Sequence, residues 1–236
     1  MLAHLLAFCE TQKQEELHRF RVQVKKIKAL LRFSQGSSSA QHLKPLQSIF
    51  QQAGKIRGAH IHLHLIEQYQ LANAELKNGQ EKTEKDETRR FCLRYNVHAK
   101  SLQRTEKVIF SNFQDIKNKV IARLYKKHLN KLARSFAQPT DRTANLHNNR
   151  KQVKMLLYFH AILPKSLVEK LRLNTSYLDR LQDAIGQWHD IISIAALLEK
   201  ERFTDKKMLA KLARQSGRLY AAILVLLGDF KKKVAQ

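Results

Sequence analysis

The sequence predicts an all-α protein because of its composition, its hydrophobic periodicity and its few chain breakers. Leu, Lys, Ala, Gln, Glu and Arg dominate the 236 residues, and all six are strong helix formers. Only seven Gly and three Pro interrupt the chain. With 43% hydrophobic residues, a chain of this length is able to bury a substantial core.

Apolar spacing and turn residues predict seven helices in order along the chain. We expect them at 11–33, 43–77, 83–111, 113–136, 142–162, 165–200 and 205–233. The pattern is interrupted by SQGSSSAQ, KNGQ, AQPTD and LPK, and RLNTS supplies N-cap residues before Tyr177. Because the connections are short, consecutive helices should pack as antiparallel neighbours in a bundle.

The first predicted helix carries a basic face directly beside its apolar face. Its apolar arc, about 80° wide, contains Leu17, Phe20, Val24, Ile27 and Leu31. The adjoining arc, also about 80° wide, contains His18, Arg21, Lys25, Lys28 and Arg32. A solvated face usually mixes acids with its bases, whereas this one has no acid. We therefore expect the cations to line a cleft between packed helices, with a solvated basic face as the alternative.

An internal repeat favours the cleft over the solvated face. The segment LHRFRVQVKKIKALLRF at 17–33 aligns with LHNNRKQVKMLLYFHAI at 146–162, and the helices that follow also align. The aligned pairs are His18 and His147, Arg21 and Arg150, Lys25 and Lys154, Gly54 and Gly186, and Arg57 and His189. We expect one domain over 1–236 with two pseudo-symmetric helical-bundle halves, 1–137 and 138–236, packed around a basic central groove.

The two halves differ at two aligned positions. Leu157 stands where the first half has Lys28, which predicts a groove weighted toward the N-terminal half. Gly58 stands where the second half has Asp190, which we expect to orient His189 or a neighbouring arginine. The repeated glycine is expected to allow close helix approach.

These motifs resemble the CHAD domain family, the conserved histidine α-helical domain. The resemblance covers nearly the whole chain through the duplicated H-x2-R-x3-K helix and LQDAIGQWHDI at 181–191, which is similar to the family's L-G-x-x-H/R-D-L element. It implies a binding module, not an enzyme, with a basic groove for inorganic polyphosphate. The implied binding residues are His18, Arg21, Lys25, Lys28, Arg32, Arg57, His147, Arg150, Lys154 and His189.

Two further groups of side chains suggest weaker sites. A second basic stripe near the C-terminus, an additional phosphate contact or a solvated face, contains Lys207, Lys211, Arg214 and Arg218. His60 and His64 in HIHLHL are one helical turn apart, but no third ligand completes a metal shell. We expect no metal there, and instead expect His60, His62 and His64 to share the face of Arg57 and extend the groove.

The charge balance indicates an anionic partner. Against 44 Lys and Arg stand 20 Asp and Glu, a formal net charge of +24. Such a chain binds nucleic acid non-specifically at low salt, so a nucleic-acid-binding protein is one alternative. An accessory domain to a phosphate-metabolism enzyme is another. We find no Gly-rich phosphate loop and no acidic cluster for magnesium, so we expect no catalytic residue and no cofactor.

The cysteines and the apolar runs of the sequence indicate where in the cell the protein is expected. Cys9 and Cys92 lie far apart without a CxxC spacing, so we expect inert thiols in a reducing cytoplasm. The runs MLAHLLAFCE and LYAAILVLLGDF are too short to span a bilayer, so we expect no membrane association. The polyphosphate hypothesis adds an expected association with polyphosphate granules.

Overall fold

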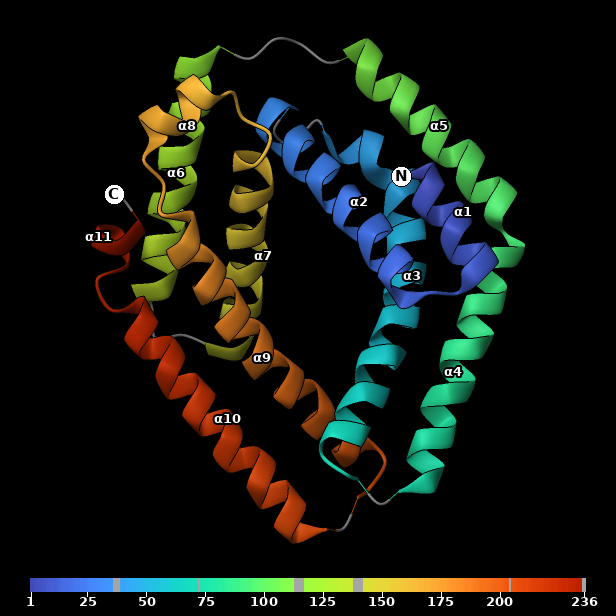
Figure 1. Cartoon of the computed structure of the whole chain (residues 1–236). Coiled ribbons are helices and arrows are strands. Elements are labelled where there is room, and N and C mark those ends of the chain that lie inside the picture. Colours follow the sequence, from blue (N-terminus) through green and yellow to red (C-terminus); the bar gives the residue numbers. More distant parts are fainter. Residues whose placement is uncertain (36–38, 72, 113–116, 138–141, 204, 235–236) are drawn as a thin grey trace. The chain divides into compact units, whose positions relative to one another are not determined.

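The computed structural model describes residues 1–35, 39–71, 73–112, 117–137, 142–203 and 205–234 (Figure 1). Over these residues the chain forms eleven helices and no strand, which confirms the all-α prediction. The described helices include none that is long and apolar enough to cross a membrane.

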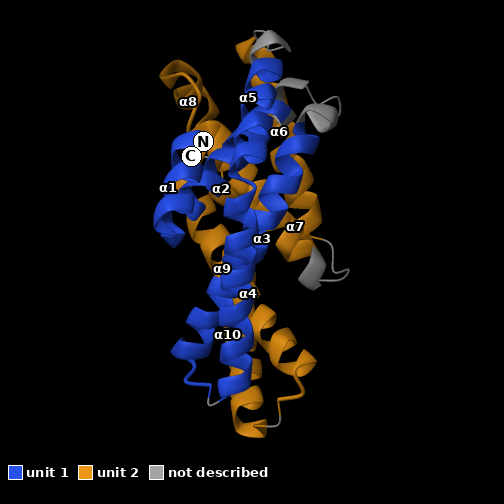
Figure 2. Cartoon of the chain, turned by 90° about the vertical axis from the view of Figure 1, so that its right-hand side faces the viewer, with its two compact units in different colours: residues 1–115 blue, residues 116–236 orange. Residues whose placement is uncertain are grey.

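The chain divides into two compact units, residues 1–115 and 116–236, which Figure 2 colours separately. The first unit contains α1 (Leu2–Thr11), α2 (Gln14–Gln35), α3 (Ser39–Gln68), α4 (Ala74–Leu93) and α5 (Tyr95–Asn112). The second contains α6 (Asn118–Ala137), α7 (Arg142–His160), α8 (Lys165–Leu171), α9 (Thr175–Lys200), α10 (Lys206–Leu227) and α11 (Phe230–Val234). The packing of α6 on α7, α8 and α11 places it in the second unit. The two sequence repeats, 1–137 and 138–236, were defined by sequence similarity and not by packing, so their boundary after residue 137 stays a prediction.

The core of the first unit is built on the predicted apolar face of α2. Leu17, Phe20, Val24 and Leu31 are fully buried there, as the helical spacing predicts. The Phe91 ring meets the Phe8 ring edge to face at 6.0 Å and the Phe20 ring at 6.4 Å, so α1 and α4 share this core with α2. The N-terminal apolar run, which gave no predicted helix, therefore folds as α1.

The core of the second unit is built around α9. This helix packs against both α7 and α10, and Figure 1 shows it between them. Its buried apolar side chains are Tyr177, Leu178, Leu181, Ile185, Trp188, Ile191, Ile194 and Leu198. Two tyrosines fix neighbouring helices, because Tyr125 Oη donates to the Leu156 carbonyl at 2.9 Å and Tyr177 Oη to the Leu226 carbonyl at 2.8 Å.

Three predicted helices are each two helices in the structure. The predicted helix at 83–111 is replaced by α4, which begins at Ala74 and includes the KNGQ segment, and by α5. The helix expected at 165–200 is α8 and α9, and that at 205–233 is α10 and α11. Two of these breaks contain a non-glycine residue in the left-handed conformation, Arg172 (φ 44°) between α8 and α9 and Asp229 (φ 55°) between α10 and α11. Gly228, the C-cap of α10, has φ −54° instead.

The turn and cap residues predicted some helix ends correctly and others not. Asn174 caps α9 as predicted, since its side chain accepts the Tyr177 backbone N–H at 3.0 Å. In the first unit α3 begins at Ser39, earlier than expected, so Pro45 lies inside the helix. The QPTD part of AQPTD and the GSS part of SQGSSSAQ lie outside the described residues.

Candidate functional site

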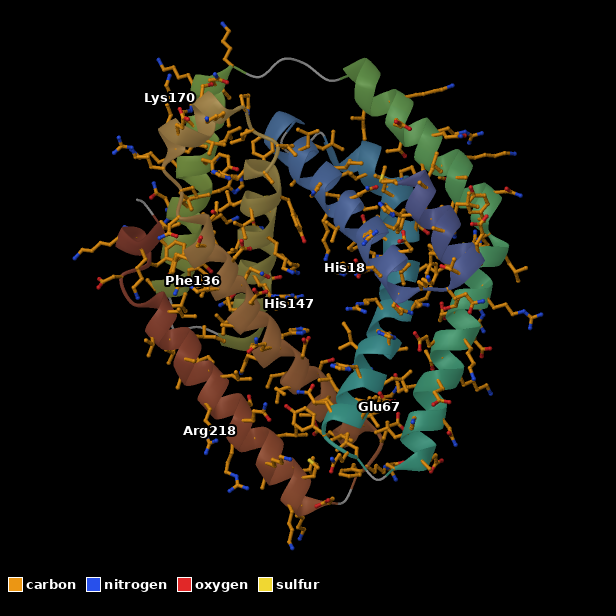
Figure 3. All side chains as sticks on the ribbon, viewed as in Figure 1. His18, Glu67, Phe136, His147, Lys170 and Arg218 are labelled. Atoms are coloured by element: carbon orange, nitrogen blue, oxygen red, sulfur yellow. The ribbon has the colours of Figure 1, made fainter. Side chains whose placement is uncertain are left out.

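The first basic face lies on α2 and α3 of the first unit, and we define it by His18, Arg21, Lys25, Lys28 and Arg57. His18, which is labelled in Figure 3, is exposed, and the other four side chains are partly buried. This burial matches their predicted position at the edge of the packed helices. The side chain of Arg32 lies outside the described residues.

Arg21 is held against the next helix by three contacts. Its Nη1 donates to the Phe50 carbonyl oxygen at 2.8 Å, and its Cζ lies 4.2 Å from the centroid of the Phe50 ring. A Cβ atom on Gly54 would stand 3.0 Å from the same Nη1, so the glycine leaves space for the guanidinium. The amino group of Lys28 lies over the same ring, 5.0 Å from the centroid. The Phe50 ring thus lies under two cations, and no pattern in the sequence pointed to it.

Burial and the nearby charge of Arg57 lower the pKa of Arg21 to about 10. Arg21 is therefore still cationic at neutral pH. Because the guanidinium is partly buried, water screens its charge less, and its interaction with an anion is stronger than at a fully exposed site.

Arg150 makes the corresponding contact in the second unit. Its Nε donates to the Gln182 carbonyl oxygen at 2.9 Å, and a Cβ atom on Gly186 would stand 2.5 Å from its Nη2. Phe50 and Gln182 each precede the glycine of their helix by four residues. Each arginine therefore bonds to the carbonyl that accepts the helical N–H of that glycine. We call this the arginine–glycine contact, and it occurs at positions that the repeat aligned.

The glycines therefore have a more specific role than predicted. We expected them to allow close approach of helices, but the nearest atoms to the absent side chains of Gly54 and Gly186 belong to Arg21 and Arg150. The groups accommodated are two guanidinium side chains. An alanine at either position would compete with an arginine for space.

The second basic face lies on α7 and α9, and we define it by His147, Arg150, Lys151, Lys154 and His189. The rings of His147, labelled in Figure 3, and His189 stack with centroids 4.3 Å apart. Nδ1 of His147 is buried and has no hydrogen-bond partner among the described residues. The ring thus retains an unused polar atom in this face.

Burial lowers the pKa of both stacked histidines, and that of His147 falls to about 4. The charges of Lys151 and Arg150 add to the effect on both rings, and His189 adds to it at His147. The adjacent Asp190 opposes the shift at His189, so it favours the imidazolium there, and its expected orienting role stays a prediction. At neutral pH the free protein therefore holds His147 uncharged.

Lys154 is also partly buried in this face. Burial and the charge of Arg150 lower its pKa, while Asp183, Asp179 and Asp190 act in the opposite direction. Lys151 was missed by the sequence interpretation, although it is four residues after His147 and hence on the same side of α7. It is exposed and completes the face.

Two of the HIHLHL histidines contact α4, and the extension of the first basic face by these residues stays a prediction. His60 Nδ1 lies 3.1 Å from Glu84 Oε1, and His62 Nδ1 lies 3.2 Å from Gln80 Oε1, so both rings contact α4. His64 is exposed. In the described part of the chain, no three His, Cys, Asp or Glu side chains are grouped to hold a metal ion.

The C-terminal basic stripe is solvent-exposed along α10. Its residues are Lys207, Lys211, Arg214 and Arg218, the last labelled in Figure 3. Arg214 Nε donates to the Ala210 carbonyl of its own helix, at 3.4 Å. These cations lack the burial of the two basic faces, so a phosphate contact there stays a prediction.

A comparison with models of protein families matches residues 1–199 to the CHAD domain. The matched segment contains both basic faces and ends within α9, so that α10 and α11 lie outside it. Comparisons with curated proteins and with solved structures found no match.

Proposed function

Because the chain belongs to the CHAD domain family, which is associated with polyphosphate binding, we propose that it binds inorganic polyphosphate on its two basic faces. The observation that carries the proposal is the repeated arginine–glycine contact. In each unit it fixes a cation within a row of Lys and His side chains. Binding without catalysis is the activity proposed.

The chemistry of these side chains suits a repeating anion without bases. Polyphosphate offers phosphate oxygens at regular intervals, and guanidinium and ammonium groups recognise them by charge-assisted hydrogen bonds. Arg21 uses Nη1 for the Phe50 carbonyl, and a guanidinium has five N–H donors in all. Donors therefore remain for phosphate while the side chain stays anchored.

The two faces should contribute differently. The first face is formed chiefly by Arg and Lys, which are cationic at neutral pH. The second face includes the stacked His147 and His189, whose pKa values are lowered in the free protein. An adjacent phosphate favours their protonated form, so we expect the second face to bind more strongly in acid. The single groove predicted from the sequence stays a prediction.

Calorimetric titration with long-chain polyphosphate tests the proposal. At physiological ionic strength the Debye length is about 8 Å, so loose surface attraction is largely screened. We would compare Lys25→Ala/Lys28→Ala on the first face with Lys151→Ala/Lys154→Ala on the second. Each pair should weaken binding at least about tenfold, since a charge-assisted hydrogen bond contributes about 1.5–3 kcal/mol.

The matched control is Lys207→Ala/Lys211→Ala, which removes the same charge from the exposed stripe on α10. It should change the affinity by less than about twofold, because exposed charges contribute little at this salt concentration. Equal losses in all three double variants would mean that net charge alone drives binding, and would contradict the proposal.

Nucleic-acid binding is a second candidate because of the net charge of +24. A duplex DNA titration under the same conditions separates the two, since binding by counterion release falls steeply as salt rises. Binding of DNA as tight as that of polyphosphate, and lost in the same variants, would favour the nucleic-acid candidate. Phosphate release from polyphosphate with magnesium present would instead indicate a role in phosphate metabolism.

We also propose a cytoplasmic location with association to polyphosphate granules. A fluorescent fusion should gather on granules, and the four lysine substitutions Lys25→Ala, Lys28→Ala, Lys151→Ala and Lys154→Ala together should disperse it. Granule association that survives all four substitutions would separate targeting from the basic faces.

A further inference from the structure

The two cysteines of the chain meet between α1 and α4 in the first unit. Cys9 lies on α1 and Cys92 on α4, and both pack against the same hydrophobic core. The preceding residues, Phe8 and Phe91, are in edge-to-face ring contact with centroids 6.0 Å apart. The two thiols lie close enough for each to affect the pKa of the other. The fold therefore makes neighbours of two thiols that no sequence motif pairs.

We propose that Cys9 and Cys92 are a redox modification site, at which a reversible disulfide links α1 to α4. This goes beyond the proposed function and does not depend on it, since neither residue belongs to a basic face. Both cysteines are free thiols in the structure. Cys92 lines an open cavity of about 540 Å³ with Gln12, Lys85, Arg89 and Leu93.

The cavity indicates which thiol reacts first and with what. Both cysteines are partly exposed, and Cys92 also borders the cavity, so a reagent held in the cavity should meet Cys92 first. Lys85 and Arg89 supply positive charge at the cavity, which favours an anionic reagent. A low-molecular-weight disulfide with carboxylates, such as oxidised glutathione, fits this chemistry.

The reaction is two successive thiol–disulfide exchanges. The Cys92 thiolate attacks one sulfur of oxidised glutathione, forms a mixed disulfide and releases one glutathione thiolate. The Cys9 thiolate then attacks the Cys92 sulfur, forms the protein disulfide and releases the second glutathione. Two electrons pass from the cysteine pair to the reagent, and the two protons lost by the cysteines end on the two glutathione thiols.

The surroundings of the pair make this exchange slow. Burial raises the pKa of both thiols, and the neighbouring Cys92 raises that of Cys9 further. Little thiolate is therefore present at neutral pH, and thiolate is the reactive form. The pair should respond to sustained oxidation and not to a brief pulse, so its test must be brought to equilibrium.

The test incubates the full folded chain in buffers of reduced and oxidised glutathione until the products no longer change. Thiols are then trapped with a maleimide, and the intact mass is measured. We expect a species with no trapped thiol, no attached glutathione and a mass lower by two hydrogen atoms. Because the disulfide closes a long loop, the melting temperature of the oxidised protein should exceed that of the reduced protein by about 10 °C.

Two single variants check the order of reaction. Cys9→Ser should accumulate a mixed disulfide on Cys92, whereas Cys92→Ser should leave Cys9 largely unmodified under the same conditions. The central measurement uses the wild type, so it stands even if a variant folds poorly. Wild-type protein that keeps both thiols, or that carries glutathione on both cysteines, in the most oxidising buffer would overturn the proposal. A polyphosphate titration of the oxidised protein is evaluated separately. Formation of the disulfide and binding of polyphosphate can then each succeed or fail without deciding the other.

Discussion

Replacing Gly186 with alanine tests whether the arginine–glycine contact is a real constraint on the second unit. The added Cβ would stand 2.5 Å from Arg150 Nη2 and 3.0 Å from its Cζ and Nε. These atoms are the end of a flexible side chain, so the Arg150 guanidinium is the group that moves aside. It then loses the 2.9 Å hydrogen bond from Nε to the Gln182 carbonyl.

The magnitude follows from two opposing effects. Gly→Ala inside a helix stabilises by about 0.5–1 kcal/mol, because alanine restricts the unfolded chain. Loss of a hydrogen bond from a charged donor costs about 1.5–3 kcal/mol. We therefore expect Gly186→Ala to lower the free energy of unfolding by about 1–2 kcal/mol.

Gly217→Ala is the matched control in the same unit. Gly217 lies inside α10, and a Cβ atom there would meet nothing within 4 Å. This variant should therefore gain the helix-propensity effect alone, so that the two variants differ by about 1.5–3 kcal/mol. Gly54→Ala and Gly58→Ala repeat the comparison within α3, with a smaller difference, because only the end of the Arg21 side chain comes as near as 3.0 Å.

Urea unfolding followed by circular dichroism supplies the free energies. A double-mutant cycle with Arg150→Ala identifies the cause, because Gly186→Ala should no longer destabilise once the guanidinium is absent. Equal stabilisation by Gly186→Ala and Gly217→Ala would refute the reasoning. So would an unchanged penalty at Gly186 in the Arg150→Ala background.

Four further outcomes follow from the same structure. The pKa of His147 is about 4 in the folded protein and near its ordinary value of 6.5 in the unfolded chain, so the unfolded state takes up the proton first as the pH falls. The free energy of unfolding should therefore decrease between pH 6.5 and pH 4. The decrease should be shallower in His147→Gln. Phosphate favours the imidazolium, so polyphosphate affinity should rise over the same acidic change; an affinity independent of pH, measured by calorimetry, would contradict this. Tyr125→Phe removes the buried 2.9 Å bond to the Leu156 carbonyl and should cost about 1 kcal/mol in urea unfolding, and no change would mean that this bond does not stabilise α6 on α7. Asn174→Ala removes the α9 cap on the Tyr177 N–H and should cost about 0.5–2 kcal/mol, whereas Asn174→Asp should retain most of the stability.

Helical periodicity predicted most of the buried residues of α2, although Ile27 of the predicted arc is only partly buried and Ala29 outside it is buried. Leu17, Phe20, Val24 and Leu31 are fully buried, and the adjoining Arg21 is partly buried. These outcomes depend only on how side chains are arranged around one helix, and this arrangement follows directly from the sequence.

The contacts between helices were harder to predict. Alignment paired Arg21 with Arg150 and Gly54 with Gly186, yet it carried no information that each arginine touches the glycine of its own unit. The approach of Cys9 to Cys92 was missed for the same reason, since it depends on how α1 packs against α4. The break at Arg172 was missed because a residue other than glycine adopts the left-handed conformation there.

Anchored arginines also affect how a repeating ligand could move. Arg21 and Arg150 are ordered by bonds to backbone carbonyls in the free protein, so little of their rotamer entropy remains to be lost when an anion arrives. They form fixed points, whereas lysines adapt to the phosphate they meet. A polymer of identical units satisfies fixed points equally well after a shift by one unit. Longer polyphosphate therefore offers more equivalent registers, so its apparent affinity should increase with length without any new contact, and the bound chain could slide between registers without dissociating.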